Sequence, residues 1–168
     1  MSRENQYQHL THRDFGPLFD ADSRTLILGS FPSVKSRRQQ FYYGHPQNRF
    51  WRIISALYGE AVPGQDDIEA KKRLILGHQL ALWDVIEECD IIGSADSTIR
   101  NVQATDLHVI LDHSRVDRVF VNGGTAMRFY RRLTLPATGI PAQQLPSSSP
   151  ANAAWSLERL VEAWQAVL

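Results

Sequence analysis

The sequence predicts an α/β fold, a three-layer α/β/α sandwich in which helices cover both faces of a four-stranded parallel sheet. Short apolar runs alternate along the chain with segments of helical periodicity, which is typical of parallel strands joined by helical crossovers. Several of these runs stop at turns rich in glycine, serine or asparagine, and open α/β sheets bind their ligands there. A chain of 168 residues, 43% of them apolar, fits one domain with a substantial core.

The first half of the chain is expected to supply two strands and two helices. Residues 1–14 are polar and are expected to be frayed. A buried apolar strand is predicted at 25–28 and a second strand at 80–85, where Asp84 stands at the end that collects ligand groups. Between them, apolar residues with helical spacing predict helices at 48–59 and 66–77, each ended by a glycine.

The second half continues the alternation of strands and helices. Its expected elements are a polar loop at 93–101, a helix at 106–111, a strand at 116–121, a helix from 125 to about 133, a strand at 143–145, a tight loop at 145–152 and a helix at 153–167. We see neither an internal repeat nor a boundary, so residues 1–168 are expected to form a single domain.

Charge limits how the protein can contact a polyanion. The chain has 18 basic and 18 acidic residues and therefore a formal net charge of zero. Proteins that coat nucleic acid without regard to sequence are usually basic. Any nucleic-acid contact should therefore be local and have a small footprint.

Cysteine content and hydropathy exclude other classes. With Cys89 as its single cysteine, the chain can form no internal disulfide and cannot supply the four thiolates of an iron–sulfur cluster. His9 and His12 are spaced as a possible ligand pair, but two ligands make a poor metal site. No apolar run approaches the ~18 residues of a membrane span, and the first twenty residues lack a signal-peptide core, so we expect a cytoplasmic protein.

The stretch that follows the first strand carries the chemistry. It reads Leu28-Gly29-Ser30-Phe31-Pro32-Ser33-Val34-Lys35-Ser36, and a second block reads Phe41-Tyr42-Tyr43-Gly44-His45-Pro46-Gln47-Asn48-Arg49-Phe50-Trp51. Aromatic rings stack on flat ligands, and side-chain amides read polar edges. These two blocks therefore point to a nucleobase as the ligand.

The same two blocks resemble the uracil-DNA glycosylase superfamily, and most closely its hypoxanthine-DNA (deoxyinosine) glycosylase branch. The resemblance runs from about Phe15 to the last helix. It implies a sheet in the strand order 2-1-3-4, counted along the chain, with the cleft between the first and third strands. It also implies an enzyme that hydrolyses the bond between deoxyribose and a deaminated base, which is hypoxanthine, uracil or xanthine.

The resemblance assigns catalysis to Asn48. In the related mismatch glycosylases a catalytic Asn or Asp lies two residues after the glycine of the first block, and here that position is Phe31, which cannot do that chemistry. In the hypoxanthine branch the essential Asn belongs to an Asn-x-Phe-Trp block, which maps to Asn48. An amide at this position can donate to a base carbonyl as the base leaves. The spacing alone leaves open that Asn48 only caps the following helix.

Further residues are predicted to bind the base or the DNA. The base would contact Gly29, Ser30, Phe31, Pro32, Ser33, Tyr43 and Asn122, the last at the turn after the third strand. The DNA backbone would contact Lys35, Ser36, Arg37, Ser147, Ser148, Ser149, Pro150 and Asn152. The residues by themselves leave open that the aromatic side chains are core packing, and that the Ser/Pro loop is a plain surface turn.

Two other functions fit parts of the sequence. A nucleotide-binding or nucleic-acid-binding domain without catalysis would use the same residues. A serine esterase with Ser30 as nucleophile needs an activating histidine, and none follows His113. The favoured interpretation is a monomeric glycosylase whose partner is DNA with a deaminated base and which needs no cofactor, no metal and no membrane.

Overall fold

The computed structural model describes residues 6–168, and its centre is a four-stranded parallel sheet. The strands are β2 (Thr25–Gly29), β3 (Leu80–Asp84), β6 (Arg118–Asn122) and β7 (Gln143–Leu145). They lie in the order β3-β2-β6-β7 with every pair parallel, so the predicted order 2-1-3-4 is confirmed. All five residues of β2 are buried, as expected of a central strand that is covered on both faces.

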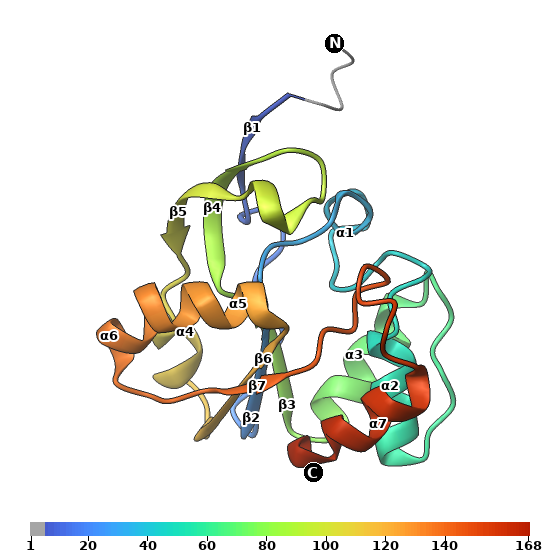
Figure 1. Ribbon diagram of the computed structural model, residues 1–168. Helices are drawn as coiled ribbons and strands as arrows, with labels where there is room; N and C mark the ends of the chain where they lie inside the picture. The colour runs from blue at the N-terminus through green and yellow to red at the C-terminus, as the bar shows by residue number, and fades with distance from the viewer. Residues whose placement is uncertain (1–5) are drawn as a thin grey trace.

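Helices cover both faces of this sheet, which confirms the three-layer sandwich (Figure 1). One layer holds α2 (Phe50–Tyr58), α3 (Ile68–Gly77) and α7 (Leu157–Trp164), which runs into a short 3₁₀ turn at Gln165–Val167. The other holds α4 (His108–Leu111), α5 (Gly124–Phe129), a π-helical segment at Tyr130–Thr134 and α6 (Leu135–Thr138). None of the helices in residues 6–168 has both the length and the apolar character that a membrane crossing requires.

Side-chain caps set the helix boundaries. Asp67 accepts a hydrogen bond from the backbone N–H of Ala70 and so starts α3. Ser156 does the same for α7 through Arg159, so that helix begins at Leu157 and not at the expected residue 153. The first helix of the chain was not predicted: α1 (Val34–Gln39) lies inside the expected loop and is capped by Ser33.

A second, antiparallel sheet was missed. Its strands are β1 (Gln8–Thr11), β4 (Ile86–Ile91) and β5 (Arg100–Ala104), in the order β1-β4-β5, with a 3₁₀ turn at Asp96–Thr98 before β5. The expectation of a frayed start is therefore wrong for residues 8–11, while residues 1–5 lie outside the described part of the chain. The expected loop at 93–101 likewise gives way to β5 at its end.

The composition of β4 and its pairing with other strands explain why this sheet was not predicted. β4 carries Glu87, Glu88 and Asp90, and acidic residues are depleted in strands. Its backbone groups are satisfied by β5, the next strand along the chain, on one side and by β1, which is distant in the sequence, on the other. The sheet lies beyond the carboxyl ends of the main strands, so it extends the molecule on the side where ligands are expected (Figure 1).

Candidate active site

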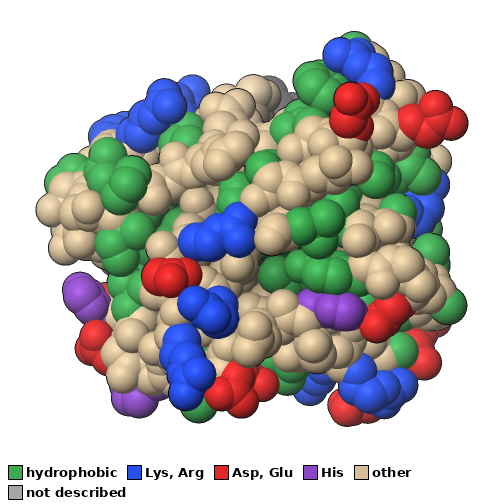
Figure 2. Space-filling model, turned by 90° about the horizontal axis from the view of Figure 1, so that it is seen from below, with side chains coloured by type: hydrophobic (Ala, Val, Ile, Leu, Met, Phe, Trp, Pro, Cys, Tyr) green, Lys and Arg blue, Asp and Glu red, His purple; other side chains and the backbone are tan. Residues whose placement is uncertain are grey.

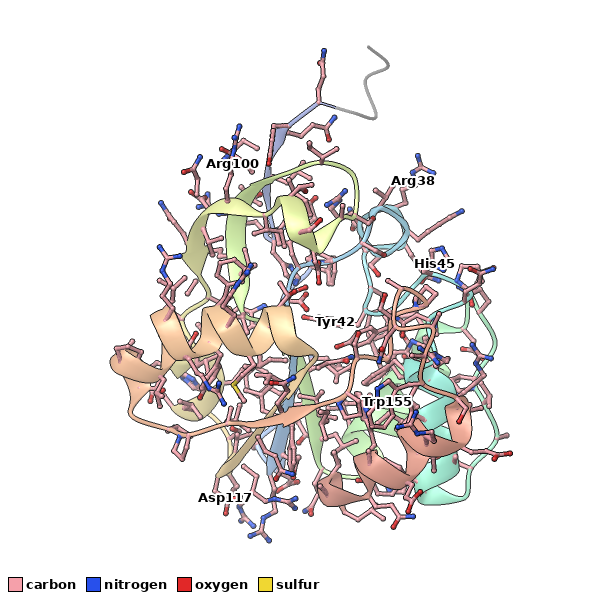
Figure 3. The ribbon with its side chains drawn as sticks, in the orientation of Figure 1. Arg38, Tyr42, His45, Arg100, Asp117 and Trp155 are labelled. Atoms are coloured by element: carbon pink, nitrogen blue, oxygen red, sulfur yellow. The ribbon has the colours of Figure 1, made fainter. Side chains whose placement is uncertain are left out.

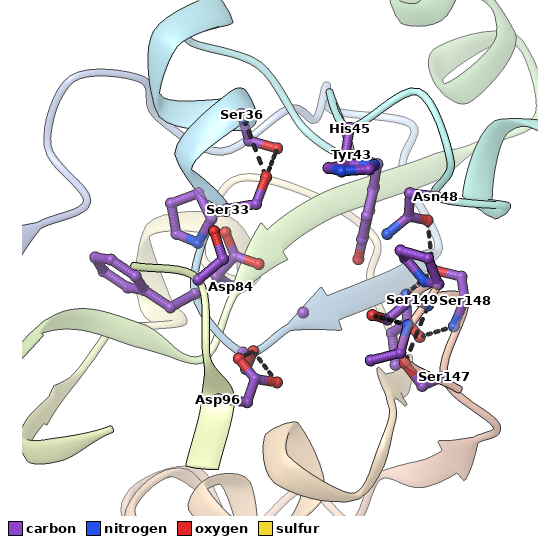
Figure 4. A pocket seen from close by; sticks show the side chains of 18 of the residues that line it. Ser33, Ser36, Tyr43, His45, Asn48, Asp84, Asp96, Ser147, Ser148 and Ser149 are labelled. Atoms are coloured by element: carbon purple, nitrogen blue, oxygen red, sulfur yellow. Dashed lines mark hydrogen bonds between the residues drawn. The ribbon is translucent and has the colours of Figure 1, made fainter. Parts of the chain in front are cut away.

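A pocket of about 610 Å³ opens at the carboxyl ends of β2, β3 and β6 (Figure 4). Most of the predicted site residues line it: Gly29, Ser30, Phe31, Pro32, Ser33, Ser36, Tyr43, Asn48, Asn122, Ser147, Ser148, Ser149 and Pro150. Lys35, Arg37 and Asn152 do not line it. The pocket therefore joins segments that are more than a hundred residues apart in the sequence.

The amide of Asn48 is held by its oxygen. Oδ1 accepts hydrogen bonds from the backbone N–H of Phe50 at 2.9 Å and from the hydroxyl of Ser148 at 2.8 Å. The Ser148 hydroxyl in turn accepts from Nδ2 of Asn122 at 2.9 Å, and the backbone N–H of Ser148 donates to Asn122 Oδ1 at 3.0 Å. Because two of these donors are backbone N–H groups, the orientation of both amides follows from the network.

This network leaves the nitrogen of Asn48 for the pocket. Nδ2 has no hydrogen-bond partner among the described residues and points into the cavity (Figure 4). The Asn48 oxygen also accepts from the N–H group of Phe50, the first residue of α2, so the contact expected of a helix cap is present, while catalysis by Asn48 stays a prediction. The site thus presents a fixed N–H donor to whatever enters the cavity.

The loop Ser147–Pro150 is held by Arg49, which sequence analysis did not assign. Its guanidinium donates to the carbonyls of Ser149 at 2.8 Å, Asn152 at 3.0 Å and Trp155. Its backbone N–H donates to the carbonyl of Ser148 at 3.1 Å. A planar guanidinium with five donors suits such a set of carbonyls. Because Arg49 follows Asn48 directly in the chain, these contacts hold the loop close to Asn48.

Two residues of the segment that follows β2 were predicted to contact DNA, and both make contacts within the protein. Ser36 is buried, and its hydroxyl accepts from the backbone N–H of Gly44 at 2.9 Å. The guanidinium of Arg37 lies 5.7 Å from the centre of the Phe31 ring and donates to the carbonyls of Pro32 and Gly93, both at 3.3 Å.

Asn152 also makes an internal hydrogen bond: its side-chain amide donates to the carbonyl of Ser147 at 3.0 Å. Of the three predicted residues outside the pocket, Lys35 alone makes no side-chain hydrogen bond or ion pair with another described residue. A DNA contact stays a prediction for all of them.

The floor of the pocket is crowded. A β-carbon on Gly29 would lie 2.4 Å from Oδ1 of Asp84 and 3.1 Å from the hydroxyl of Tyr43, so glycine is required there. The Tyr43 ring stacks on Phe50 with ring centres 4.0 Å apart, which leaves its other face for the cavity. Burial and the nearby Asp84 raise the pKa of Tyr43, so its hydroxyl stays protonated.

Two carboxylates belong to the pocket although neither was assigned to it. Asp84 is buried at the floor, where its position at a strand end was the available signal, and its Oδ2 lies 2.6 Å from Nε2 of His12. Asp96 lies at the exposed rim and accepts from the Ser30 hydroxyl, at 3.2 Å to each oxygen. No signal in the sequence links Ser30 to Asp96, because the pattern around Asp96 predicts only a polar loop.

No group of three or more potential metal ligands occurs within residues 6–168. The pocket itself presents one amide donor without a partner among the described residues, two carboxylates, a protonated phenol, hydroxyls and aromatic faces. Such a set suits recognition of a flat, polar ligand by stacking and hydrogen bonds.

Comparisons with known proteins identify the family. The family model described as the uracil DNA glycosylase superfamily matches residues 17–168. A hypoxanthine DNA glycosylase from Methanosarcina acetivorans is 37% identical over 156 residues, which cover 92% of this chain and 96% of that protein. A hypoxanthine DNA glycosylase from Methanosarcina barkeri is 33% identical over 141 residues, with coverages of 82% and 86%.

A solved structure shares the fold. It is a solution NMR structure from Methanosarcina acetivorans, provisionally named a uracil DNA glycosylase, with 36% sequence identity and a TM-score of 0.74. The match covers 91% of this chain and 93% of that one.

Proposed function

This chain belongs to the uracil DNA glycosylase superfamily and is a DNA glycosylase for deaminated bases, and we propose that it removes hypoxanthine with Asn48 as catalytic residue. The observation that carries the proposal is the orientation of the Asn48 amide, whose nitrogen faces the cavity while two donors hold its oxygen. The names of the two relatives support hypoxanthine as the base.

The amide stabilises the departing base. When the N-glycosidic bond breaks, positive charge develops on the sugar and negative charge on the base. Nδ2 of Asn48 donates to an oxygen or ring nitrogen on which that negative charge gathers. Because Ser148 and the Phe50 N–H already hold the amide, little reorganisation is needed as the charge forms.

Asp84 supplies the complementary group on the floor. Its Oδ1 has no hydrogen-bond partner among the described residues and lies over Gly29, where it can accept from a ring N–H. Hypoxanthine carries such an N–H beside its carbonyl, whereas adenine has a lone pair at the same position. A carboxylate acceptor therefore favours the deaminated base over its parent, and uracil and xanthine share the feature.

Stacking and backbone contacts complete the proposal. The free face of Tyr43, or the ring of Phe31, stacks on the extruded base, which contributes roughly 1–3 kcal/mol. Ser147, Ser149 and Pro150 contact the DNA beside the gap, since hydroxyls and N–H groups suit phosphates without demanding a sequence. A monomer in the cytoplasm, without metal or cofactor, belongs to the same proposal.

The test is excision from defined DNA. Duplex oligonucleotides with one deoxyinosine, deoxyuridine or deoxyxanthosine are incubated with the protein and then treated with hot alkali, which breaks the strand at abasic sites. We expect scission with deoxyinosine for the wild type and a loss of about 10²–10³ in rate for Asn48→Ala, as for removal of one preorganised donor. Gln47→Ala is the matched control, because Gln47 is exposed and outside the pocket.

The outcome separates the functions that the sequence left open. Intact strands with retained DNA binding would replace the glycosylase by a binding module of the same fold. An Asn48→Ala variant as active as wild type would remove the proposed mechanism. A serine esterase is disfavoured already, because the Ser30 hydroxyl donates to Asp96 and no histidine activates it among the described residues.

A further inference from the structure

We propose that His12 is a positioning residue of the active site, which holds the Asp84 carboxylate so that one oxygen faces the base. The inference rests on the proposed function, because it concerns the group that reads the base. It makes the N-terminal strand β1, with the residue that follows it, a required part of the site. Nothing in the sequence pattern around His12 points to such a role.

His12 and Asp84 form a short hydrogen bond, and both side chains are buried. Nε2 of His12 lies 2.6 Å from Oδ2 of Asp84, and the two residues are only 5% and 4% exposed. A carboxylate oxygen only accepts, so the His12 nitrogen donates. Charge-assisted hydrogen bonds of this length are strong, and a buried carboxylate without a partner is costly. No other described side chain hydrogen-bonds the Asp84 carboxylate, so its orientation depends on His12.

Strand pairing brings the two residues together. β4 starts two residues after Asp84, and β1 pairs with it antiparallel, with Thr11 opposite Glu88. The next residue, His12, then donates its backbone N–H to the carbonyl of Glu87 at 2.5 Å. The small sheet therefore places the imidazole beneath the pocket floor, next to the end of β3.

The other ring nitrogen argues against a purely structural role. Nδ1 of His12 is buried and has no hydrogen-bond partner among the described residues. Around it lie the rings of Phe15, Tyr42 and Phe31, with centres 4.5, 6.0 and 6.3 Å from the imidazole. An aromatic hydrocarbon would fill such a place without an orphaned polar atom. What only histidine adds there is the Nε2 donor to Asp84.

The hydrogen bond from His12 fixes the orientation of the Asp84 carboxylate. With Oδ2 held by His12, Oδ1 is left over Gly29 at the floor of the pocket. A rotated carboxylate would move this acceptor away from its position over Gly29. His12 thus acts on the base through Asp84 and does not touch the base itself.

The experiment uses three variants and one double variant of the full chain. His12→Phe keeps the ring among its aromatic neighbours but removes the donor, and His12→Gln restores a donor. Asp84→Asn and the double variant His12→Phe/Asp84→Asn complete a cycle. Single-turnover excision of hypoxanthine gives the rates, thermal unfolding reports folding, and the imidazole ¹⁵N and ¹H resonances of His12 report its hydrogen bond.

We expect His12→Phe to fold and to lose activity by a factor of roughly 3 to 100, the usual range for coupled neighbours. His12→Gln should recover part of that loss, and the double variant should be no slower than Asp84→Asn alone. Losses that multiply in the double variant would overturn the proposal, as would full activity in His12→Phe.

The resonances separate this proposal from the wider one. In wild type the Nε2 proton of His12 should be strongly shifted by its carboxylate partner, and Asp84→Asn should abolish that shift. If the protein cleaves nothing, the proposed function fails, and the active-site role of His12 fails with it. An unshifted resonance in a protein that does excise hypoxanthine would overturn the His12 proposal alone.

Discussion

At the scale of single residues, hydrogen bonds from neighbouring residues decide which polar atom of each amide or carboxylate faces the cavity. Asn48 and Asp84 each have one polar atom held by the protein and one directed to the cavity. Each needs a second residue, Ser148 or His12, to make that choice. Residues that never touch a ligand should therefore affect excision in a graded way.

Ser148→Ala tests that gradation. The change removes one of the two donors to Asn48 Oδ1 and leaves the bond from the Phe50 N–H. We expect a loss of about tenfold in the single-turnover rate, since a hydrogen bond is worth about 1 kcal/mol net and the amide gains some freedom to rotate. Gln47→Ala is again a suitable control, because Gln47 is exposed and does not line the pocket. A Ser148→Ala enzyme as slow as Asn48→Ala would show that Ser148 does more than orient the amide.

At the scale of elements, the site is made where two loops from different parts of the chain meet. The turn after β6 passes so close to the loop after β7 that a β-carbon on Gly123 would lie 3.1 Å from Cβ of Ser147. Gly123 also has φ of +96°, a conformation that other residues rarely adopt. The approach of the loops therefore depends on this glycine.

Gly123→Ala should destabilise the protein by about 1–3 kcal/mol, because both strain and contact oppose the methyl group. In a chain of this length that lowers the melting temperature by about 2–4 °C per kcal/mol. Gly139→Ala is the matched control, since Gly139 has φ of +69° but a β-carbon there would meet no atom within 4 Å. Equal losses in both variants would mean that the contact with Ser147 contributes nothing.

Arg49→Lys tests the clamp on the loop after β7. Lysine keeps the charge but cannot reach three carbonyls with one planar fork. We expect weaker binding of DNA, with a rise in KM of about threefold to tenfold, because the loop proposed to contact the DNA becomes mobile. Such losses correspond to roughly one hydrogen bond. The measurement is steady-state excision at fixed salt. Arg52→Lys serves as control, because Arg52 is exposed and makes one long contact at 3.4 Å. An unchanged KM in Arg49→Lys would count against the clamp.

At the scale of the whole molecule, the feature of interest is the distribution of basic and acidic side chains, which are equal in number. Figure 2 shows the end opposite the pocket, where basic and acidic side chains alternate, and Arg24 and Asp117 form an ion pair of 3.9 Å there. Arg38, His45 and Arg100 lie at the pocket end, and Asp117 lies at the other (Figure 3). These basic side chains lie at the pocket end of a chain that has no net charge. A local DNA contact with a small footprint stays a prediction for that end.

Cys89 reports the integrity of the whole fold. It is fully buried in β4, and burial raises the pKa of its thiol to about 11. Because the thiolate is the reactive form, we expect iodoacetamide at a pH of about 8 to modify native protein very slowly and unfolded protein at once. Mass spectrometry across a urea series gives the measurement. Fast alkylation of native protein would show that the small sheet opens far more readily than the rest.

Prediction from the sequence succeeded where one local pattern decides an element. The apolar run of β2 and the glycine after it predicted the central strand and the pocket beside it. It failed for β1, β4 and α1, because β1 and β4 carry polar residues and are stabilised by partners distant in the sequence, and α1 is a short polar helix. Arg49 and His12 were not assigned to the site, because their contacts join segments distant in the sequence. Asp84 had a local signal, its place at a strand end, but was not assigned either.

By itself, the sequence determined the class of fold, the order of the strands through its family resemblance, and most of the residues that line the pocket, because periodicity and turn chemistry are local properties. Only the tertiary structure decided which atom of each side chain faces the ligand. That choice is made by hydrogen bonds between residues far apart in the chain, such as Ser148 with Asn48 and His12 with Asp84. No local pattern encodes such pairs, since they exist only once the two sheets have brought the chain together.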